Sequence, residues 1–319
     1  MTDDELHSLP FPDTWDNTMR TLALTCPRKF YLFLRGFDYA SRPSYFAWGS
    51  AWHEILRTWY TFTSRPPAND PDFWILAGKA VKAGEAYWDD AGAPDDGDNN
   101  RAALGRIFEA YLEQYPEEPF TLIPRGDESG WTWPLGLQLE GREMYLGGSI
   151  DLYIDWPPYG TLPLENKTSG TYLGENYVLQ WEFAPQITGY IWYVSQLLDQ
   201  PCWGCLVNMV TKKIPGKRSN WSTPRFARTL PQKRPEALIE FEEDFRADLR
   251  RIYALNWAPW RWPRTVDQSN CTGGVGKAPC LFKSFCLTNV PYKETDPLTF
   301  QGIALRDGPW EPWKRAGGE

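Results

Sequence analysis

The chain has 319 residues, of which 42% are hydrophobic, 16% aromatic and 23% charged, a composition typical of a folded globular protein rather than a disordered one. Its formal net charge of -8 argues against a protein that coats nucleic acid over its whole surface, but it is compatible with a local basic groove. No apolar run reaches the roughly 20 residues of a membrane helix, and the acidic start MTDDELHSLP is unlike a signal peptide. We therefore expect a cytoplasmic protein that does not bind membranes.

The first third of the chain is predicted to be mainly helical. Apolar residues with helical spacing occur from about 14 to 62, and again over 71–90 and 101–115. From about 119 the pattern changes to strands separated by turn residues, in the stretches WTWPLGLQLE, REMYLGGSIDLYIDW and TLPLENKT.

The second half of the chain predicts a helix from about 180 to 198 and then a strand in CWGCLVNMVTKK, which begins at Cys202. Two strands, a helix and a further strand indicate an α/β core. Residues 235–256 predict an amphipathic helix with acids early and arginines late, as the helix dipole favours. We expect one integrated domain with three consecutive parts: a helical N-terminal part (1–118), a core (119–234), and a C-terminal helix and tail (235–319).

Two acids and a lysine stand out on the strands predicted within residues 147–170. Glu165 and Lys167 are two residues apart, so they project to the same side of a strand, while Asn166 points away. Asp151 ends the preceding strand segment, and pairing of the two strands as a hairpin would bring the three charged groups together. A carboxylate pair suits a hard divalent cation, and an ammonium beside it suits phosphodiester hydrolysis. An E-x-K pair alone is also common as a surface salt bridge.

Two helices carry further candidate residues. Gln186 and Tyr190 lie one turn apart on one helix face. His53, one of only two histidines, follows Gly49 on a helix. Each feature by itself is also typical of ordinary structural residues, so only their combination is informative.

The six cysteines are predicted to be reduced, because a cytoplasmic protein rarely keeps disulfides and clustered thiols there more often hold a metal. One cysteine lies early and three lie late: Cys26, Cys271, Cys280 and Cys286. Four thiolates suit a [4Fe-4S] cluster or a Zn²⁺ ion, and buried structural cysteines are the alternative. Cys202 and Cys205 are predicted to pack on opposite faces of the apolar strand, with a second metal site as the alternative.

Residues 211–234 carry eight Lys or Arg and no acid, with aromatic residues between them. Such a run predicts a basic groove that holds nucleic acid strands, and a solvated basic hairpin is the alternative. A second basic pair lies beside Cys26. The candidate DNA-binding residues are therefore Arg28, Lys29, Lys212, Lys213, Lys217, Arg218, Trp221, Arg225 and Phe226.

Taken in order, four motifs resemble those of the PD-(D/E)XK nuclease superfamily. They are G-x-x-x-H (Gly49 to His53), an Asp on a strand (Asp151), E-x-K (Glu165 to Lys167) and Q-x-x-x-Y (Gln186 to Tyr190). The resemblance is greatest to the RecB-like branch, which includes the CRISPR-associated adaptation exonucleases and the AddB nuclease domain. It implies a restriction-endonuclease-like α/β fold, with a mixed central sheet flanked by helices, a helical N-terminal part and a C-terminal cysteine segment that closes a metal cluster.

The resemblance also implies a role for each residue. His53, Asp151, Glu165 and the Asn166 carbonyl would bind Mg²⁺ or Mn²⁺, Lys167 would be catalytic, and Gln186 and Tyr190 would contact the site or the DNA. Cys26, Cys271, Cys280 and Cys286 would hold a [4Fe-4S] cluster. One departure stands out: the family often has two residues between the first two late cysteines, whereas eight separate Cys271 from Cys280 here.

These features predict a metal-dependent DNA exonuclease that acts in recombination, repair or end processing, for example in a phage or other mobile element. A structure-specific endonuclease and a non-catalytic DNA-binding scaffold are the alternatives. The expected partners are single-stranded or duplex DNA ends, a second copy of the chain, and recombination or CRISPR proteins.

Overall fold

The computed structural model describes residues 11–62, 68–97, 99–123, 129–212, 225–254, 262–273, 278–288 and 295–314. The described residues form two compact units, each made of several stretches of the chain. Unit 1 contains residues from Met1–Ser41, Gly130–Gly148 and Ile239–Arg315, and unit 2 contains residues from Arg42–Ser129 and Ser149–Leu238. The units therefore combine residues from all three of the consecutive parts predicted from the sequence, whose boundaries stay a prediction.

Unit 2 is built on a mixed sheet, in which the described strands are ordered β3 (Thr121–Leu122), β6 (Leu152–Trp156), β7 (Gly160–Ser169), β8 (Leu206–Thr211) and β9 (Phe226–Thr229). Strands β6 and β7 form the predicted antiparallel hairpin, with Leu152 opposite Leu164. Strands β7 and β8 are parallel, and β8 and β9 are antiparallel. A mixed sheet accompanied by helices agrees with the predicted α/β class.

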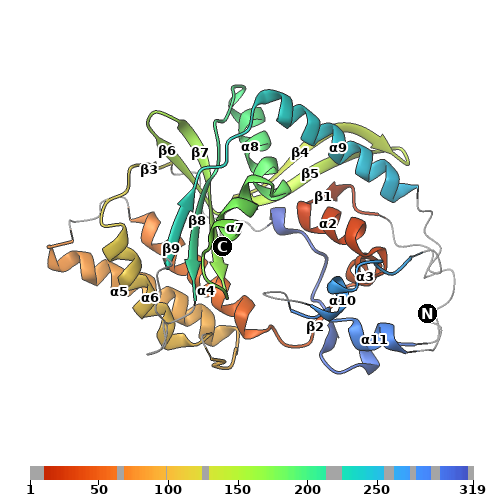
Figure 1. Cartoon of the computed structure of the whole chain (residues 1–319), viewed down its shortest axis with the longest axis horizontal. Helices are drawn as coiled ribbons and strands as arrows, with labels where there is room; N and C mark the ends of the chain where they lie inside the picture. The colour runs from red at the N-terminus through yellow and green to blue at the C-terminus, as the bar shows by residue number, and fades with distance from the viewer. Residues whose placement is uncertain are drawn as a thin grey trace. The chain divides into compact units, whose positions relative to one another are not determined.

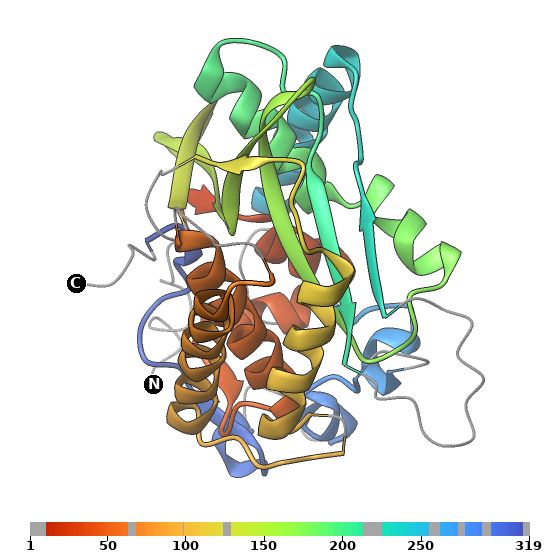
Figure 2. The same cartoon turned by 90° about the vertical axis from the view of Figure 1, so that its left-hand side faces the viewer.

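The helices of unit 2 are α4 (Ser44–Thr61), α5 (Pro71–Asp90), α6 (Arg101–Gln114), α7 (Glu175–Leu179), the 3₁₀ helix η1 (Gln180–Glu182) and α8 (Pro185–Leu198). Figure 1 and Figure 2 show α4, α5 and α6 packed together as a group. The single helix predicted from about 180 to 198 is wrong at its start. Pro185 occupies the first turn of α8, where a missing N–H is tolerated, and a separate short helical segment precedes it.

The strand predicted to begin at Cys202 starts instead at Leu206, so Cys202 and Cys205 precede β8 rather than alternate along it. The backbone passes close to Pro231 here, because a Cβ on Gly204 would lie only 2.7 Å from the Pro231 carbonyl oxygen. The Cys205 amide donates to the same oxygen at 3.1 Å. Both thiols are buried.

A buried polar network lies on the side of β7 that carries Asn166. The Asn208 side chain on β8 donates to the Asn166 side-chain oxygen at 2.9 Å and to the Tyr111 hydroxyl of α6 at 3.0 Å. Arg228 on β9 donates to the Asn208 oxygen at 3.1 Å and forms an ion pair with Glu118 at 2.6 Å. Asn166 therefore points into a satisfied network, away from Glu165 and Lys167, as strand alternation predicts.

Unit 1 contains two small sheets. In one, β1 (Thr14–Trp15) pairs in parallel with β5 (Arg142–Ile150), which neighbours β4 (Ser129–Leu139); in the other, β2 (Phe37–Tyr39) pairs with β10 (Ile303–Leu305). Its helical elements are α2 (Asn17–Thr25), α3 (Pro27–Leu34), most of α9 (Pro235–Tyr253), α10 (Ser269–Thr272), α11 (Lys283–Leu287), η4 (Pro297–Thr299) and η5 (Pro312–Lys314). The helix predicted from about 14 starts later, because Asp16 caps α2 by accepting from the Met19 amide at 2.7 Å.

Among the helices in the described ranges, none combines the length and the apolar character that a bilayer-spanning segment requires.

The packing of α5 on α4 depends on Gly84. A Cβ at this position would lie 2.3 Å from Ile55 Cγ1 and 2.7 Å from the Ala51 carbonyl oxygen. We therefore expect Gly84→Ala to lower the free energy of unfolding by about 1–3 kcal/mol, because the backbone of α4 must move. A Cβ at Gly78, on the same helix, would meet no described atom within 4 Å. Gly78→Ala should instead raise the free energy of unfolding by about 0.5–1 kcal/mol. Urea unfolding measures both, and effects of equal sign would contradict this packing.

Candidate active site

Strand β7 places the side chains of Glu165 and Lys167 next to each other. Lys167 Nζ donates to Glu165 Oε1 at 2.5 Å and to the side-chain oxygen of Gln186, in the first turn of α8, at 2.9 Å. The side chain of Glu165 is only 4% exposed. The two charges predicted to share a strand face therefore form an ion pair between a buried glutamate and a partly buried lysine, rather than a solvated surface pair.

Asp151, in the residue between β5 and β6, joins this pair to α4. One carboxylate oxygen, Asp151 Oδ2, accepts from the backbone amide of Asn166 at 2.7 Å. The other, Oδ1, lies 3.3 Å from Nδ1 of His53. Gly49 lies one turn before His53, and a Cβ there would be 3.2 Å from Thr168 Oγ1 on β7. The small residue thus allows α4 to approach β7 closely enough for His53 to reach Asp151.

Gln186 and Tyr190 form a hydrogen-bonded chain along one face of α8. The Gln186 amide donates to the Tyr190 hydroxyl at 2.7 Å, and that hydroxyl donates to the carbonyl of Ser149 at 2.6 Å. The Gln186 amide also lies 3.3 Å from Glu165 Oε1. This chain fixes the orientation of the Gln186 amide, so that its oxygen faces the Lys167 ammonium.

The buried charges shift one another's pKa values. Burial raises the pKa of Glu165 and the negative charge of Asp151 raises it further; the Lys167 ammonium opposes both, and the result is about 7. For Lys167, burial lowers the pKa, but the charge and hydrogen bond of Glu165 outweigh burial and raise it overall. Lys167 is therefore still protonated at the pH, near 7, where Glu165 ionises.

The pKa values of His53 and Asp151 shift in opposite directions, as expected for an ion pair. Burial lowers the pKa of His53, but the charge and hydrogen bond of Asp151 outweigh burial and raise it to about 9. Burial conversely raises the pKa of Asp151, and His53 together with the Asn166 amide lowers it below its usual value. In this arrangement one imidazolium and one ammonium balance two carboxylates.

One oxygen of the site has no partner within the described part of the chain. Glu165 Oε2 is fully buried and accepts no hydrogen bond there. A buried carboxylate oxygen without a donor is costly unless something positive approaches it. In the arrangement seen, no three or more His, Cys, Asp and Glu side chains of the described residues form a group able to hold a metal ion. The hard oxygen donors nevertheless fit a divalent cation in chemical type.

Comparison with known proteins identifies the family. A family model described as the PD-(D/E)XK nuclease superfamily matches residues 20–287. The chain belongs to the PD-(D/E)XK nuclease superfamily. No curated protein matches it. Two solved structures also match. SSO0001 has 14% identity over 76% of this chain and 79% of its own, with a TM-score of 0.30. A protein of Eubacterium rectale described as "Putative exonuclease" has 13% identity over 90% of this chain and 98% of its own, with a TM-score of 0.41.

The superfamily predicted from the motifs is therefore confirmed, and its members typically use divalent metal ions. The RecB-like branch stays a prediction.

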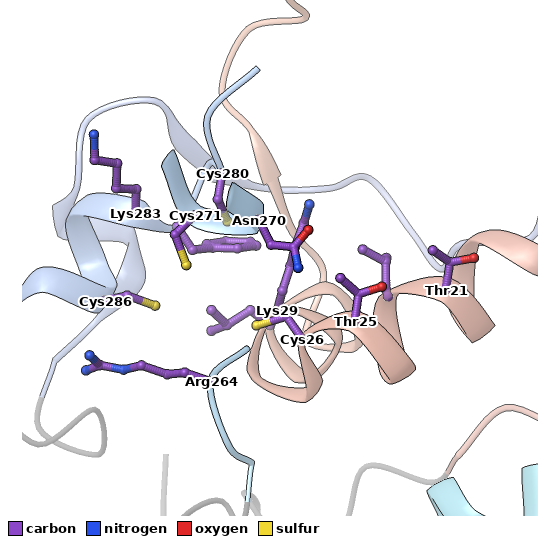
Figure 3. A pocket seen from close by; sticks show the side chains of 13 residues that line it. Thr21, Thr25, Cys26, Lys29, Arg264, Asn270, Cys271, Cys280, Lys283 and Cys286 are labelled. Atoms are coloured by element: carbon purple, nitrogen blue, oxygen red, sulfur yellow. The ribbon is translucent and has the colours of Figure 1, made fainter. Parts of the chain in front are cut away.

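The four cysteines predicted to bind a cluster line one cavity in unit 1 of this PD-(D/E)XK protein. Cys26 lies between α2 and α3, with Pro27 starting α3 directly after it. The Cys280 amide donates to the Cys271 carbonyl oxygen at 3.0 Å, which brings these two cysteines together despite the long gap between them. The cavity has a volume of about 170 Å³, and Figure 3 shows the sulfur atoms of Cys26, Cys271 and Cys286 turned towards its interior.

Positive side chains surround this cavity. Burial raises the pKa of Cys280, and the neighbouring thiols raise it further, whereas Lys29 lowers it. Burial also raises the pKa of Cys286, against the opposing effect of Arg28 and Arg264. The structure therefore places the predicted DNA-binding pair Arg28 and Lys29 beside the cysteines, where their charge acts on the thiols.

The predicted basic groove is only partly at the surface. Lys212 is 5% exposed, and its ammonium donates to the Tyr45 carbonyl at 2.7 Å. Phe226 is also buried, with its ring 5.5 Å from that of Tyr111. These two residues are therefore corrected from DNA contacts to core residues, because Lys212 packs against α4 and Phe226 packs against α6. Arg225 is partly exposed, and Lys213, Lys217, Arg218 and Trp221 lie outside the described residues.

Two residues near the site were missed by the sequence analysis. The Trp181 ring lies 5.1 Å from Lys167 Nζ. Burial and the charge of Glu165 raise the pKa of Cys205 well above its usual value, which keeps that thiol protonated. Trp181 could have been noticed in the sequence as an aromatic residue just before the Q-x-x-x-Y helix. Nothing in the sequence distinguishes Cys205 from a core cysteine.

The His53–Asp151 pair gives a pH-dependent prediction for the metal-free protein. Because the folded pKa of His53 is raised to about 9 from 6.5, the stabilisation from this pair is complete below pH 6.5 and is lost as the pH rises through about 9. Asp151→Asn should return the His53 pKa to 6.5 or below. NMR titration of the imidazole in EDTA measures this directly. The difference in melting temperature between the wild type and Asp151→Asn should also become smaller as the pH rises from 6.5 to about 9. A His53 that titrates alike in both proteins would exclude the pair.

Proposed function

We propose that this PD-(D/E)XK protein is a metal-dependent exonuclease that hydrolyses phosphodiester bonds of DNA during recombination, repair or end processing. The observation that supports this most is the buried Glu165–Lys167 pair, in which one glutamate oxygen holds the lysine and the other is left without a partner among the described residues. A structural ion pair would satisfy both oxygens. A carboxylate oxygen without a hydrogen-bond donor, next to an ammonium that is held in place, is an arrangement that suits a hydrolytic site.

Asp151, Glu165 and the Asn166 carbonyl would hold Mg²⁺ or Mn²⁺, with His53 as a further ligand. When bound, the ion would polarise the phosphate and lower the pKa of a bound water. His53 is paired with Asp151 through Nδ1 in the structure, so as a ligand it would lose one proton and would offer its other ring nitrogen, Nε2, to the ion.

Lys167 would act directly on the reacting groups. Its ammonium is held by Glu165 and Gln186, so it can position the attacking water or stabilise negative charge on the phosphate without first being reoriented. Gln186 would position Lys167, and Tyr190 would position Gln186 through the hydrogen bond to its amide.

Lys167→Met should lower DNA hydrolysis in Mn²⁺ by about 100- to 1000-fold, because it removes a preorganised charge at the site. Glu165→Gln should have a similar effect, and EDTA should abolish hydrolysis by the wild type. Lys79→Met, at an exposed position on α5, is the matched control and should retain full activity. Release of labelled nucleotides is the measurement. Undiminished hydrolysis by Lys167→Met would exclude this site.

The same assay separates the alternatives. An exonuclease shortens end-labelled linear DNA but leaves circular DNA intact, whereas an endonuclease cuts both, and a DNA-binding scaffold cuts neither. No described contact favours either alternative over the exonuclease.

We also propose that Cys26, Cys271, Cys280 and Cys286 hold a [4Fe-4S] cluster with a structural role. The shared cavity in unit 1, lined by all four cysteines, supports this proposal. Burial raises the pKa of Cys280 and Cys286, and the nearby Lys29, Arg28 and Arg264 only partly offset that effect. A cluster there would join Cys26 to three residues near the end of the chain and so close a long loop.

Protein purified without oxygen should be brown and contain about four iron atoms per chain. Cys271→Ala should lose most of the iron, whereas Cys202→Ala, at a buried cysteine of unit 2, should retain it. Metal analysis and visible absorbance measure the outcome. Colourless protein with stoichiometric zinc, lost in the same variant, would instead identify a zinc site.

Arg28, Lys29 and Arg225, with the basic residues outside the described ranges, remain the proposed DNA contacts. The cytoplasmic location and the recombination or CRISPR partners also remain proposals from the sequence.

A further inference from the structure

An aromatic segment connects the strand and the helix that carry the candidate site. It spans residues 170–184, is here called the β7–α8 segment, and contains α7 and η1. Three of its large apolar side chains are exposed: Tyr172 (59%), Leu179 (48%) and Phe183 (77%). Exposed apolar side chains on a segment next to a charged site are candidates for a binding surface.

The segment contacts the catalytic lysine directly. The Trp181 ring lies 5.1 Å from Lys167 Nζ, and the ring of Tyr177 lies 6.1 Å from that of Trp181 in an edge-to-face arrangement. The indole N–H of Trp181 is buried and has no hydrogen-bond acceptor within the described residues. A donor without an acceptor beside Lys167 is suited to a negatively charged group that enters the site.

Hydrogen bonds hold the segment in place at both ends. Near its start, the Thr171 amide donates to the Ser169 hydroxyl at the end of β7 at 3.1 Å, and from the middle of the segment the Tyr177 side chain also bonds to Ser169. Near its end, the Lys233 ammonium donates to the Glu182 carbonyl, and the Phe183 amide donates to the Gln180 carbonyl at 3.2 Å. Gln186, which holds Lys167, follows Phe183 by three residues. The exposed Phe183 ring is therefore carried on a turn that Lys233 holds at Glu182 and that leads into α8 and Gln186.

We propose that the β7–α8 segment binds unpaired bases of the DNA strand next to the scissile phosphate, with Phe183 as the main stacking ring. Aromatic rings next to a cation bind single strands of any sequence, because every base has a face that can stack and every phosphate is negative. Bases of a duplex are already stacked on one another and cannot use the ring. The inference rests on the proposed function and names its substrate as a single-stranded or frayed DNA end.

Binding measured without hydrolysis tests this inference. The wild type and Phe183→Ala are titrated in EDTA against a labelled single strand of about 20 nucleotides, a blunt duplex of the same length, and a strand with abasic sites in place of its bases. Phe183→Ala should weaken binding of the normal single strand by about 10-fold, and should change binding of the duplex and of the abasic strand by less than about 2-fold. Because Phe183 is exposed, its loss should leave thermal stability nearly unchanged.

Trp74→Ala is the matched control, because Trp74 is an exposed aromatic residue (47%) on α5. It should bind all three ligands like the wild type. The inference is overturned if Phe183→Ala behaves like Trp74→Ala, if it weakens the abasic strand as much as the normal one, or if the wild type does not bind the single strand. Hydrolysis in Mn²⁺ is measured separately. If Phe183 contributes to single-strand binding as expected but the protein hydrolyses no DNA, the proposed activity is overturned and the proposed stacking surface is kept.

Discussion

The buried Glu165 lies beside the partly buried Lys167 on β7, and the rest of the site is arranged around the electrostatic cost of taking these two charges out of water. Taking a carboxylate and an ammonium out of water is unfavourable unless each finds partners of good geometry. Gln186 supplies a second acceptor for the ammonium, while Asp151 adds a further negative charge that His53 balances. The unpartnered Glu165 Oε2 is the one point at which this compensation is incomplete among the described residues, and it is the point at which a cation would be most favourable.

The two sides of β7 have different tasks. On one side, Glu165 and Lys167 face α8 and the charged site. On the other, Asn166 joins Asn208, and through it the Arg228–Glu118 ion pair, in a network with few unsatisfied groups. Such a network tolerates little displacement of the strand, because a shift of β7 would break several buried hydrogen bonds at once. The positions of Glu165 and Lys167 are thus fixed largely from the opposite side of the strand, by side chains that do not touch the site.

In unit 1, the cysteine cavity shows how a short local contact can compensate for an unusual spacing. The hydrogen bond from the Cys280 amide to the Cys271 carbonyl draws together two residues that the longer gap would separate, and the α10 and α11 helices carry Cys271 and Cys286 to the same cavity. Cys26 is placed there by the Pro27 that begins α3. The cationic residues around the cavity are as much a part of this environment as the thiols, because they favour the ionised form.

The sequence by itself determined the features that depend on neighbours along the chain. The alternation of a strand puts Glu165 and Lys167 on one side of β7, helical spacing pairs Gln186 with Tyr190, and the order of these motifs indicates the superfamily. Burial and long-range contacts were decided only by the tertiary structure. Lys212 and Phe226 look like members of a basic groove in the sequence, but α4 and α6 cover them in the structure. Trp181 lies 14 residues after Lys167 in the sequence, and only the fold brings its ring to the lysine. Periodicity reports which side a residue faces, whereas packing between distant segments decides what covers that side.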